Sequence, residues 1–297
     1  MPLDAFLSHS SEDAALVKRL KLALEADRLA VWLDRTNIRP GFMLRDEIQA
    51  GIRDSRVLVL VWSKAASKTR WVAAEILTAF HVNRFIVACV RDDTPLPYFL
   101  QNALYLQVQP RRTEWIAQLG RGIRDAPAAA NEIPGGMRNP PADVEAAARR
   151  LALEQYAILD LLNQNDVKGA SVRQAALDPA MKAAEAQWRF QARILNLAGY
   201  HRKNAYMLRH WPEIQAYRQP RDPLLVRAER RFFDSLFADP LDYEALNGLG
   251  SILYFEREYH AAEFFIRRAL ALARKAGVRY SAAESDLALV LRARGGN

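Results

Sequence analysis

The chain has 297 residues, enough for two domains of ordinary size, and 51% of them are apolar. No apolar run approaches the roughly 18–20 residues that cross a bilayer, the first ten residues do not have the pattern of a signal peptide, and a single cysteine excludes an internal disulfide framework. The net charge of +8 is spread evenly, with 18 basic against 14 acidic residues in 1–125 and 24 against 20 beyond, which favours solvated helix faces over a nucleic-acid surface.

The cysteine, Cys89, lies in the apolar run 84–90, so we expect buried packing rather than a reactive thiol. These features together predict a cytoplasmic protein without a membrane partner, and they make a nucleic-acid partner an unfavoured interpretation.

Residues 1–125 alternate strand and helix patterns. Ser10 or Ser11 is placed as the N-cap of the first helix, with acidic residues in its first turn. The alternation predicts a flavodoxin-like α/β fold, with a five-stranded parallel sheet covered by helices on both sides and a ligand site beyond the carboxyl ends of the strands. The expected strands are 4–9, 30–34, 56–63, 85–90 and 103–108, and the expected helices are 11–28, 43–55, 70–83 and 112–124, with a short helical turn near 96–101.

Residues 126–141 are rich in Pro, Gly, Ala and Asn without periodicity, which predicts a linker. The remainder predicts an all-α domain, so the expected organisation is 1–125, 126–141 and 142–297. Helical patterns cover 142–165, 171–198, 202–217, 222–238, 242–256, 260–275 and 281–294.

One segment of that helical half resembles the tetratricopeptide repeat, and a second segment, 195–216, does so only weakly. Gly250 and Ala262 are the small residues expected to let two paired helices approach closely. The matching positions are Leu246, Leu249, Gly250, Leu253, Ala262, Ile266 and Ala269.

Common nucleotide and metal motifs are absent. The first strand is not followed by G-x-G-x-x-G, and the chain has no G-K-[ST] loop, so neither a hydride-transfer enzyme nor a P-loop NTPase is indicated. The five histidines lack metal-ligand spacing, so no metal site is predicted.

Three segments of the first half, 6–13, 31–44 and 70–76, resemble in order and spacing the TIR (Toll/interleukin-1 receptor) domain of the NAD-cleaving kind. The last of them, RWVAAEI, carries Trp71 and Glu75 in a W-x-x-x-E element. The resemblance covers about 125 of the 297 residues and implies that Glu75 is the catalytic carboxylate.

The chemistry can also be argued from the residues. Trp71 and Glu75 are four apart and share one helix face. Cleavage between nicotinamide and ribose builds positive charge on the sugar, which a nearby carboxylate stabilises, and nicotinamide leaves neutral without an acid. Trp71 could wall the pocket. The plainer alternatives are a solvated surface position for Glu75 and core packing for Trp71.

The resemblance further implies that Ser8, His9 and Ser10 line the substrate pocket. Other candidate positions carry open alternatives: Asp34 could bind a ribose or cap its loop, and Ser63 could be an N-cap or a pocket hydroxyl. Asn37 falls where some family members have lysine, Arg39 could meet a phosphate, and Gly41 suits the loop backbone.

We therefore expect an NAD glycohydrolase that releases nicotinamide and ADP-ribose or a cyclic ADP-ribose, with NAD as substrate and no cofactor. The resemblance implies that activity needs self-association through the TIR domains, and a protein or small molecule is expected to trigger it through the helical half. The expected setting is bacterial antiphage defence. The alternatives are a non-enzymatic TIR scaffold or effector, and a base-exchange enzyme using the same pocket.

Overall fold

The computed structural model describes residues 3–33, 44–109, 112–133 and 140–295. It divides into two compact units, Met1–Pro134 and Gly135–Asn297. The division falls inside the segment 126–141. Within the described residues, no helix is both long and apolar enough to cross a membrane.

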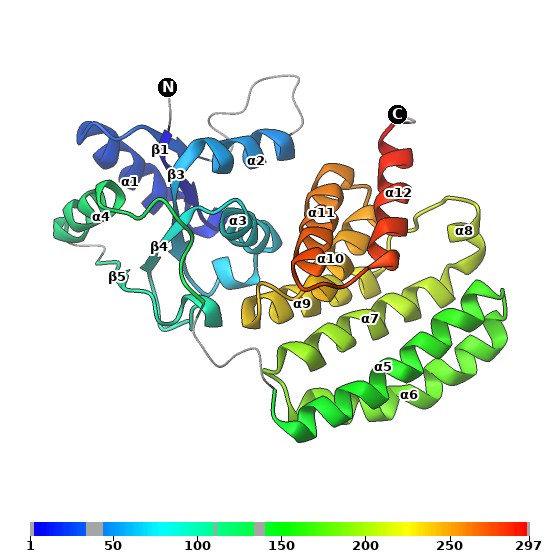
Figure 1. Cartoon of the computed structure of the whole chain (residues 1–297). Helices are drawn as coiled ribbons and strands as arrows, with labels where there is room; N and C mark the ends of the chain where they lie inside the picture. The colour runs from blue at the N-terminus through cyan, green and yellow to red at the C-terminus, as the bar shows by residue number, and fades with distance from the viewer. Residues whose placement is uncertain (1–2, 34–43, 110–111, 134–139, 296–297) are drawn as a thin grey trace. The chain divides into compact units, whose positions relative to one another are not determined.

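The first unit is built on a five-stranded parallel sheet in the order β2-β1-β3-β4-β5 (Figure 1). This is the flavodoxin-like order, so the predicted fold class is confirmed. β3 is buried along almost its whole length, as its run of Val and Leu predicts for a strand covered on both faces. The strands are β1 Leu3–Ser8, β2 Val31–Leu33, β3 Ser55–Trp62, β4 Phe85–Val90 and β5 Tyr105–Gln107.

Helices cover both faces of this sheet. Figure 1 shows α1 and α4 on one side and α2 and α3 on the other. Cys89 is fully buried in the core beneath α1 and α4, and burial raises the pKa of its thiol to about 12, which confirms its packing role. The helices are α1 Ala14–Ala26, α2 Leu44–Asp54, α3 Arg70–His81 and α4 Glu114–Arg124.

The first part of the expected linker is hydrogen-bonded to the sheet. The side chain of Asn131 accepts a hydrogen bond from the backbone N–H of Ile86 (2.8 Å) and donates one to the carbonyl of the same residue (3.1 Å). β5 pairs with β4 only from Ala88 onward, so the Asn131 amide satisfies backbone groups that β5 does not reach. Composition alone did not reveal this attachment.

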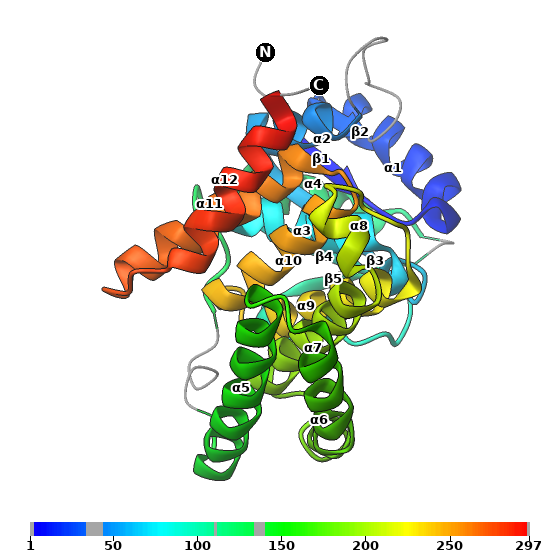
Figure 2. The same cartoon turned by 90° about the vertical axis from the view of Figure 1, so that its right-hand side faces the viewer.

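The second unit is entirely helical in its described part. Successive helices pack against one another, and α5 and α6 run side by side (Figure 1 and Figure 2). Its helices are α5 Ala142–Asn163, α6 Val167–Gln187, α7 Ala192–Arg209, α8 Trp211–Gln215, α9 Pro223–Ala238, α10 Tyr243–Phe255, α11 Tyr259–Lys275 and α12 Ser281–Gly295.

The expected helices 171–198 and 202–217 are wrong in their boundaries. α6 ends at Gln187 and α7 begins at Ala192, so the first expected helix is broken at 188–191, whereas α7 runs through the expected gap at 199–201. The broken stretch contains neither Gly nor Pro, and the proline of α6, Pro179, is tolerated inside the helix. The packing of the helices, rather than a helix-breaking Gly or Pro, therefore decides where α6 ends and α7 begins.

The close approach expected from Gly250 and Ala262 is confirmed. A Cβ on Gly250 would lie 2.4 Å from Cγ1 of Ile266 and 3.2 Å from the carbonyl oxygen of Ala262, so α10 and α11 touch at this point. The tetratricopeptide assignment itself stays a prediction.

Two other glycines make room for one aromatic ring. A Cβ on Gly199 of α7 would lie 2.7 Å from Cε1 of Phe232, and one on Gly248 of α10 would lie 2.2 Å from the same atom. Phe232 of α9 is fully buried, and Tyr200 meets its ring edge-on at 5.1 Å. The ring of Phe232 is therefore a packing centre for α7, α9 and α10.

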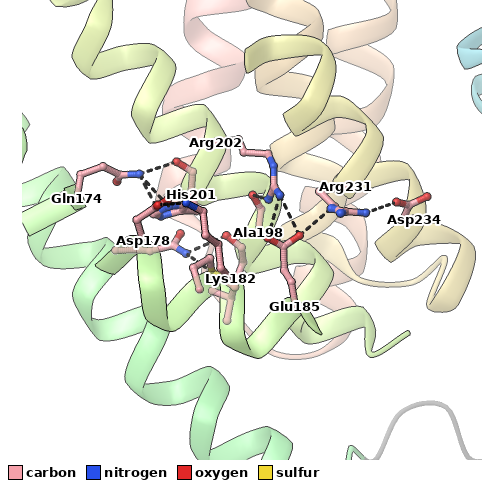
Figure 3. Close-up of polar contacts among 12 residues, drawn as sticks. Gln174, Asp178, Lys182, Glu185, Ala198, His201, Arg202, Arg231 and Asp234 are labelled. Carbon is pink, nitrogen blue, oxygen red and sulfur yellow. Dashed lines mark hydrogen bonds and ion pairs between the residues drawn. The ribbon is translucent and has the colours of Figure 1, made fainter. Parts of the chain in front are cut away.

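Ion pairs hold α6, α7 and α9 together. Arg202 of α7 binds both carboxylate oxygens of Glu185 of α6 (3.0 and 2.8 Å), and Arg231 of α9 binds the same carboxylate (2.8 Å) and also Asp234 (3.0 Å) (Figure 3). The Glu185 side chain is only 14% exposed, so its two guanidinium partners offset the cost of burying its charge.

The glycine at 248 generates a stability prediction. We expect Gly248→Ala to destabilise the helical unit by about 1–3 kcal/mol, because the new methyl group collides with the Phe232 ring and this outweighs the better helix propensity of alanine. Chemical denaturation followed by circular dichroism measures the change. Gly295→Ala is the control, because nothing lies within 4 Å of its Cβ. Equal stability of the two variants would contradict this packing.

His201 generates a pH prediction. It is 6% exposed and contacts Gln174 (3.0 Å) and Asp178 (3.1 Å), with Lys182 and Arg202 nearby (Figure 3). Burial lowers the pKa of His201 below 6.5 and outweighs the raising effect of Asp178. The unfolded chain then binds the proton more readily, so stability is full above pH 6.5 and is lost as the pH falls toward the lowered pKa.

Thermal denaturation of wild type and His201→Gln across this pH range tests the effect. The glutamine variant is expected to lose less stability on acidification, because its side chain takes up no proton. If the stability of the two proteins fell equally with pH, His201 would not be the cause of the loss.

Candidate active site

The centre of the site is a buried carboxylate at the carboxyl end of β1. Ser8 is the last residue of β1, is fully buried, and donates a hydrogen bond from its hydroxyl to Oε2 of Glu75 over 2.5 Å. Glu75 is 4% exposed, so the interpretation of a solvated surface glutamate is excluded. A carboxylate therefore lies at the sheet edge where parallel α/β sheets bind ligands.

The sequence of α3 explains this burial. Val72, Glu75, Ile76 and Ala79 follow the i, i+3, i+4, i+7 spacing of one helix face, and all four are buried. An apolar face that contains one glutamate carries that glutamate into the interior. The spacing is visible in the sequence and is a second signal for Glu75 besides the W-x-x-x-E element.

Trp71 lies one turn before Glu75 but outside the buried core. Its ring is partly exposed, and the guanidinium of Arg70 stands 5.1 Å from the ring centroid. This partial exposure disfavours simple core packing for Trp71.

The residues after β1 play different parts. Ser10 is 3% exposed and accepts a hydrogen bond from the backbone N–H of Glu12 (3.3 Å), which makes it the N-cap of the short helix Ser11–Asp13. The choice left open between Ser10 and Ser11 is thereby decided. His9, between Ser8 and Ser10, is partly exposed.

A second polar cluster lies at the ends of β3 and β4. The Ser63 hydroxyl donates to Oδ2 of Asp13 (2.7 Å) and accepts from the backbone N–H of Ala66 (3.1 Å), and Arg91 forms an ion pair with Oδ1 of Asp13. The hydroxyl of Ser63 is thus used in capping and in holding Asp13. Sequence reasoning identified Asp13 only as an acidic first-turn residue and did not identify Arg91, because no local pattern joins residues 78 positions apart.

Three further candidates, Asp34, Asn37 and Gly41, lie outside the described residues, as does Arg39. Within the described part of the chain, no group of three or more His, Cys, Asp or Glu side chains is arranged to hold a metal ion.

The first unit is similar to known proteins. Residues 5–124 match the family model described as TIR domain. A probable 2′ cyclic ADP-D-ribose synthase, TcpO, of Methanobrevibacter olleyae is 37% identical over 73 residues, which are 24% of this chain and 21% of that protein. The NAD(+) hydrolase PdTIR of Paracoccus denitrificans is 38% identical over 76 residues, 25% of each chain.

These matches are partial, because the chain spans only about a quarter or less of the length of the curated relatives. Among solved structures, the TIR domain of the Toll-related receptor TRR-2 from Hydra magnipapillata is 20% identical with a TM-score of 0.38, covering 41% of this chain and 99% of that one.

The Asp13 cluster generates a prediction. Asp13→Ala is expected to lower the stability of the first unit by about 1.5–3 kcal/mol, because it leaves Ser63 and Arg91 without their shared carboxylate. Thermal or chemical denaturation measures the loss. Asp93→Ala is the matched control, since Asp93 is exposed on the loop after β4 and its removal should change stability by less than about 0.5 kcal/mol. Similar losses in both variants would refute the structural role of the cluster.

Proposed function

We propose that residues 5–124, which form a TIR domain, cleave the bond between nicotinamide and ribose in NAD. The observation that carries this proposal is the buried Glu75 carboxylate, bound by Ser8 at the carboxyl end of β1. The names of the two partial relatives, a cyclic ADP-ribose synthase and an NAD(+) hydrolase, support the same chemistry.

The reaction suits one carboxylate. The bond from the ribose carbon to the nicotinamide nitrogen breaks, its electron pair goes to the nitrogen, and nicotinamide leaves neutral without an acid. The positive charge that develops on the ribose is stabilised by Glu75. Burial strengthens this effect, because the carboxylate acts in a site of low dielectric constant.

In this proposal the neighbouring residues position the Glu75 carboxylate and enclose the substrate pocket. Ser8 orients the Glu75 carboxylate, and the partly exposed ring of Trp71 walls the pocket. His9 and Ser10, which follow β1, border the entry for the dinucleotide. Ser63 contributes by holding Asp13 at the neighbouring strand end.

The loop residues Asp34, Asn37 and Gly41 complete the proposed substrate site, with Asp34 next to a ribose. NAD is the substrate, and no further cofactor takes part.

The assembly and setting are also proposals. Self-association through the TIR domains completes the pocket, and the helical unit controls that association in response to a protein or small molecule. Water attacking the ribose carbon gives ADP-ribose, whereas attack by a group of the same nucleotide gives a cyclic product. A cytoplasmic role in bacterial antiphage defence fits an enzyme that depletes NAD or makes a signal from it.

The proposal is tested by following nicotinamide release from NAD with the purified full chain over a wide range of protein concentration. Glu75→Gln keeps the size of the side chain and removes its charge, so the rate should fall about 10²-fold or more while the thermal melting temperature stays close to that of wild type. Glu25→Gln is the control, because Glu25 is exposed near the far end of α1.

Wild type should also gain activity per molecule as its concentration rises, as expected for an enzyme that needs self-association. Equal trace activity of wild type and Glu75→Gln at every concentration would reject the enzyme and favour a TIR scaffold. Chromatography of the products separates hydrolysis from cyclisation.

A further inference from the structure

The helical unit contains two adjoining cavities. The larger, of about 400 Å³, is lined by α5, α7, α10, α12 and the residues just before α12, and the smaller, of about 280 Å³, lies among α7, α8, α10, α11 and α12. Lys203, Met207 and Asp286 line both of them. Together the cavities have the size of a small-molecule site.

Lys203 is the polar group at their junction. It is only 8% exposed, and within the described part of the chain no hydrogen bond or ion pair holds its ammonium. Its nitrogen lies 4.9 Å from the ring centroid of Tyr200, and burial lowers its pKa from 10.5 although the charge of Asp286 opposes this. A buried cation in this state is stabilised by any anion that reaches it.

Two buried amide residues that line the larger cavity, Asn196 and Asn247, each have a carbonyl oxygen without a hydrogen-bond partner among the described residues. The Nδ2 of Asn196 donates to Glu244 (3.4 Å), and the Nδ2 of Asn247 donates to Asp286 (2.9 Å). Because a carboxylate only accepts, each amide must turn its nitrogen toward it, which leaves Oδ1 on the other side. Both Oδ1 atoms are buried and have no hydrogen-bond partner among the described residues. An N–H or O–H donor on a ligand that reaches these oxygens would satisfy them.

The charges around the larger cavity limit the ligand to a single negative charge. Its described lining carries two basic residues, Arg193 and Lys203, and two acidic residues, Glu244 and Asp286. Arg193 pairs with Glu244 at 3.6 Å, and Asp286 accepts hydrogen bonds from Asn247 and Ser251. Among the described lining residues, Lys203 is the cation that no hydrogen bond or ion pair holds, although the charge of Asp286 acts on it. A nucleotide with two or three phosphates would therefore meet two carboxylates and one such cation. A monoanionic carboxylate fits.

The smaller cavity supplies an apolar chamber beside Lys203. Its walls include Trp211, Phe255, Ile266 and Leu289. A volume of about 280 Å³ accepts a large aliphatic or aromatic side chain. One α-carbon can carry all three groups: a carboxylate at Lys203, an N–H that faces Asn196 or Asn247, and an apolar side chain in this chamber.

We propose that these cavities bind an N-acylated amino acid with an apolar side chain, either as a free metabolite or as the carboxyl-terminal residue of a peptide. Its carboxylate binds the Lys203 ammonium, its amide N–H donates to the free Oδ1 of Asn196 or Asn247, and its side chain fills the chamber beside Trp211. Binding of this ligand does not require that the first unit cleaves NAD.

Isothermal titration calorimetry of the full chain tests this with chemical pairs. N-acetyl-leucine, N-acetyl-phenylalanine and N-acetyl-methionine are compared with their carboxamides and with N-acetyl-glycine. At least one apolar acid should bind saturably. Its carboxamide and N-acetyl-glycine should bind about tenfold more weakly or worse, because the first lacks the carboxylate and the second lacks the apolar side chain. An alanine-rich hexapeptide ending in the preferred residue distinguishes the sources: tighter binding of the peptide indicates a protein terminus, and weaker binding indicates a metabolite.

Lys203→Met provides the variant arm. It keeps the length of the side chain without the charge and should bind the acid about tenfold more weakly or worse, while Lys182→Met, at an exposed position on α6, should bind like wild type. Three results would overturn the proposal: no apolar acid binds at millimolar concentration, acid and amide bind equally, or Lys203→Met retains wild-type affinity. The comparison of acid and amide on wild type decides the matter even where the variant does not fold.

Discussion

The cost of burying a carboxyl group is the constraint on which the first unit depends. Glu75 belongs to the interior face of α3, and an isolated carboxylate there would be strongly unfavourable. The fold places a donor against it at the carboxyl end of a strand, where Ser8 lies. The neighbouring strand end follows the same rule, with Asp13 shared between Ser63 and Arg91. These hydrogen bonds and ion pairs make the described part of this sheet edge polar, which suits the proposed site for NAD.

In the helical unit, the buried charges on one side of α7 have ion-pair partners among the described residues, whereas the buried lysine on its other side has none. Arg202 shares the Glu185 carboxylate with Arg231, so three helices meet in a paired network (Figure 3). Lys203, the next residue, points about 100° away around the helix into the cavities, where no carboxylate or carbonyl binds it within the described residues. Tight packing of the surrounding helices, with Phe232 set against two glycines, fixes the walls of that space. An unpaired cation in a firm cavity is a different state from a solvated surface lysine.

Much of both units could be predicted from the chain itself. Apolar runs and helical periodicity gave the five strands, their parallel arrangement and the all-helical second half, because these patterns report which side of each element meets a core. They failed at 171–217, where the apolar spacing continues through the break after Gln187 and no Gly or Pro marks it. Composition also hid the attachment of Asn131 to β4, because its partner Ile86 is 45 residues away.

The sequence by itself determined which candidate catalytic groups are present and how they are spaced. A glutamate lies four residues after a tryptophan, on an otherwise apolar helix face that follows a central strand. Residue types and spacing express such local relations, because a helix repeats every 3.6 residues whatever surrounds it. Only the tertiary structure decided that Ser8 bonds Glu75, that Asp13 joins Ser63 to Arg91, and that Lys203 faces a cavity without a partner. Those facts depend on how distant segments pack, and packing energies are shared among many weak contacts that no short stretch of sequence contains.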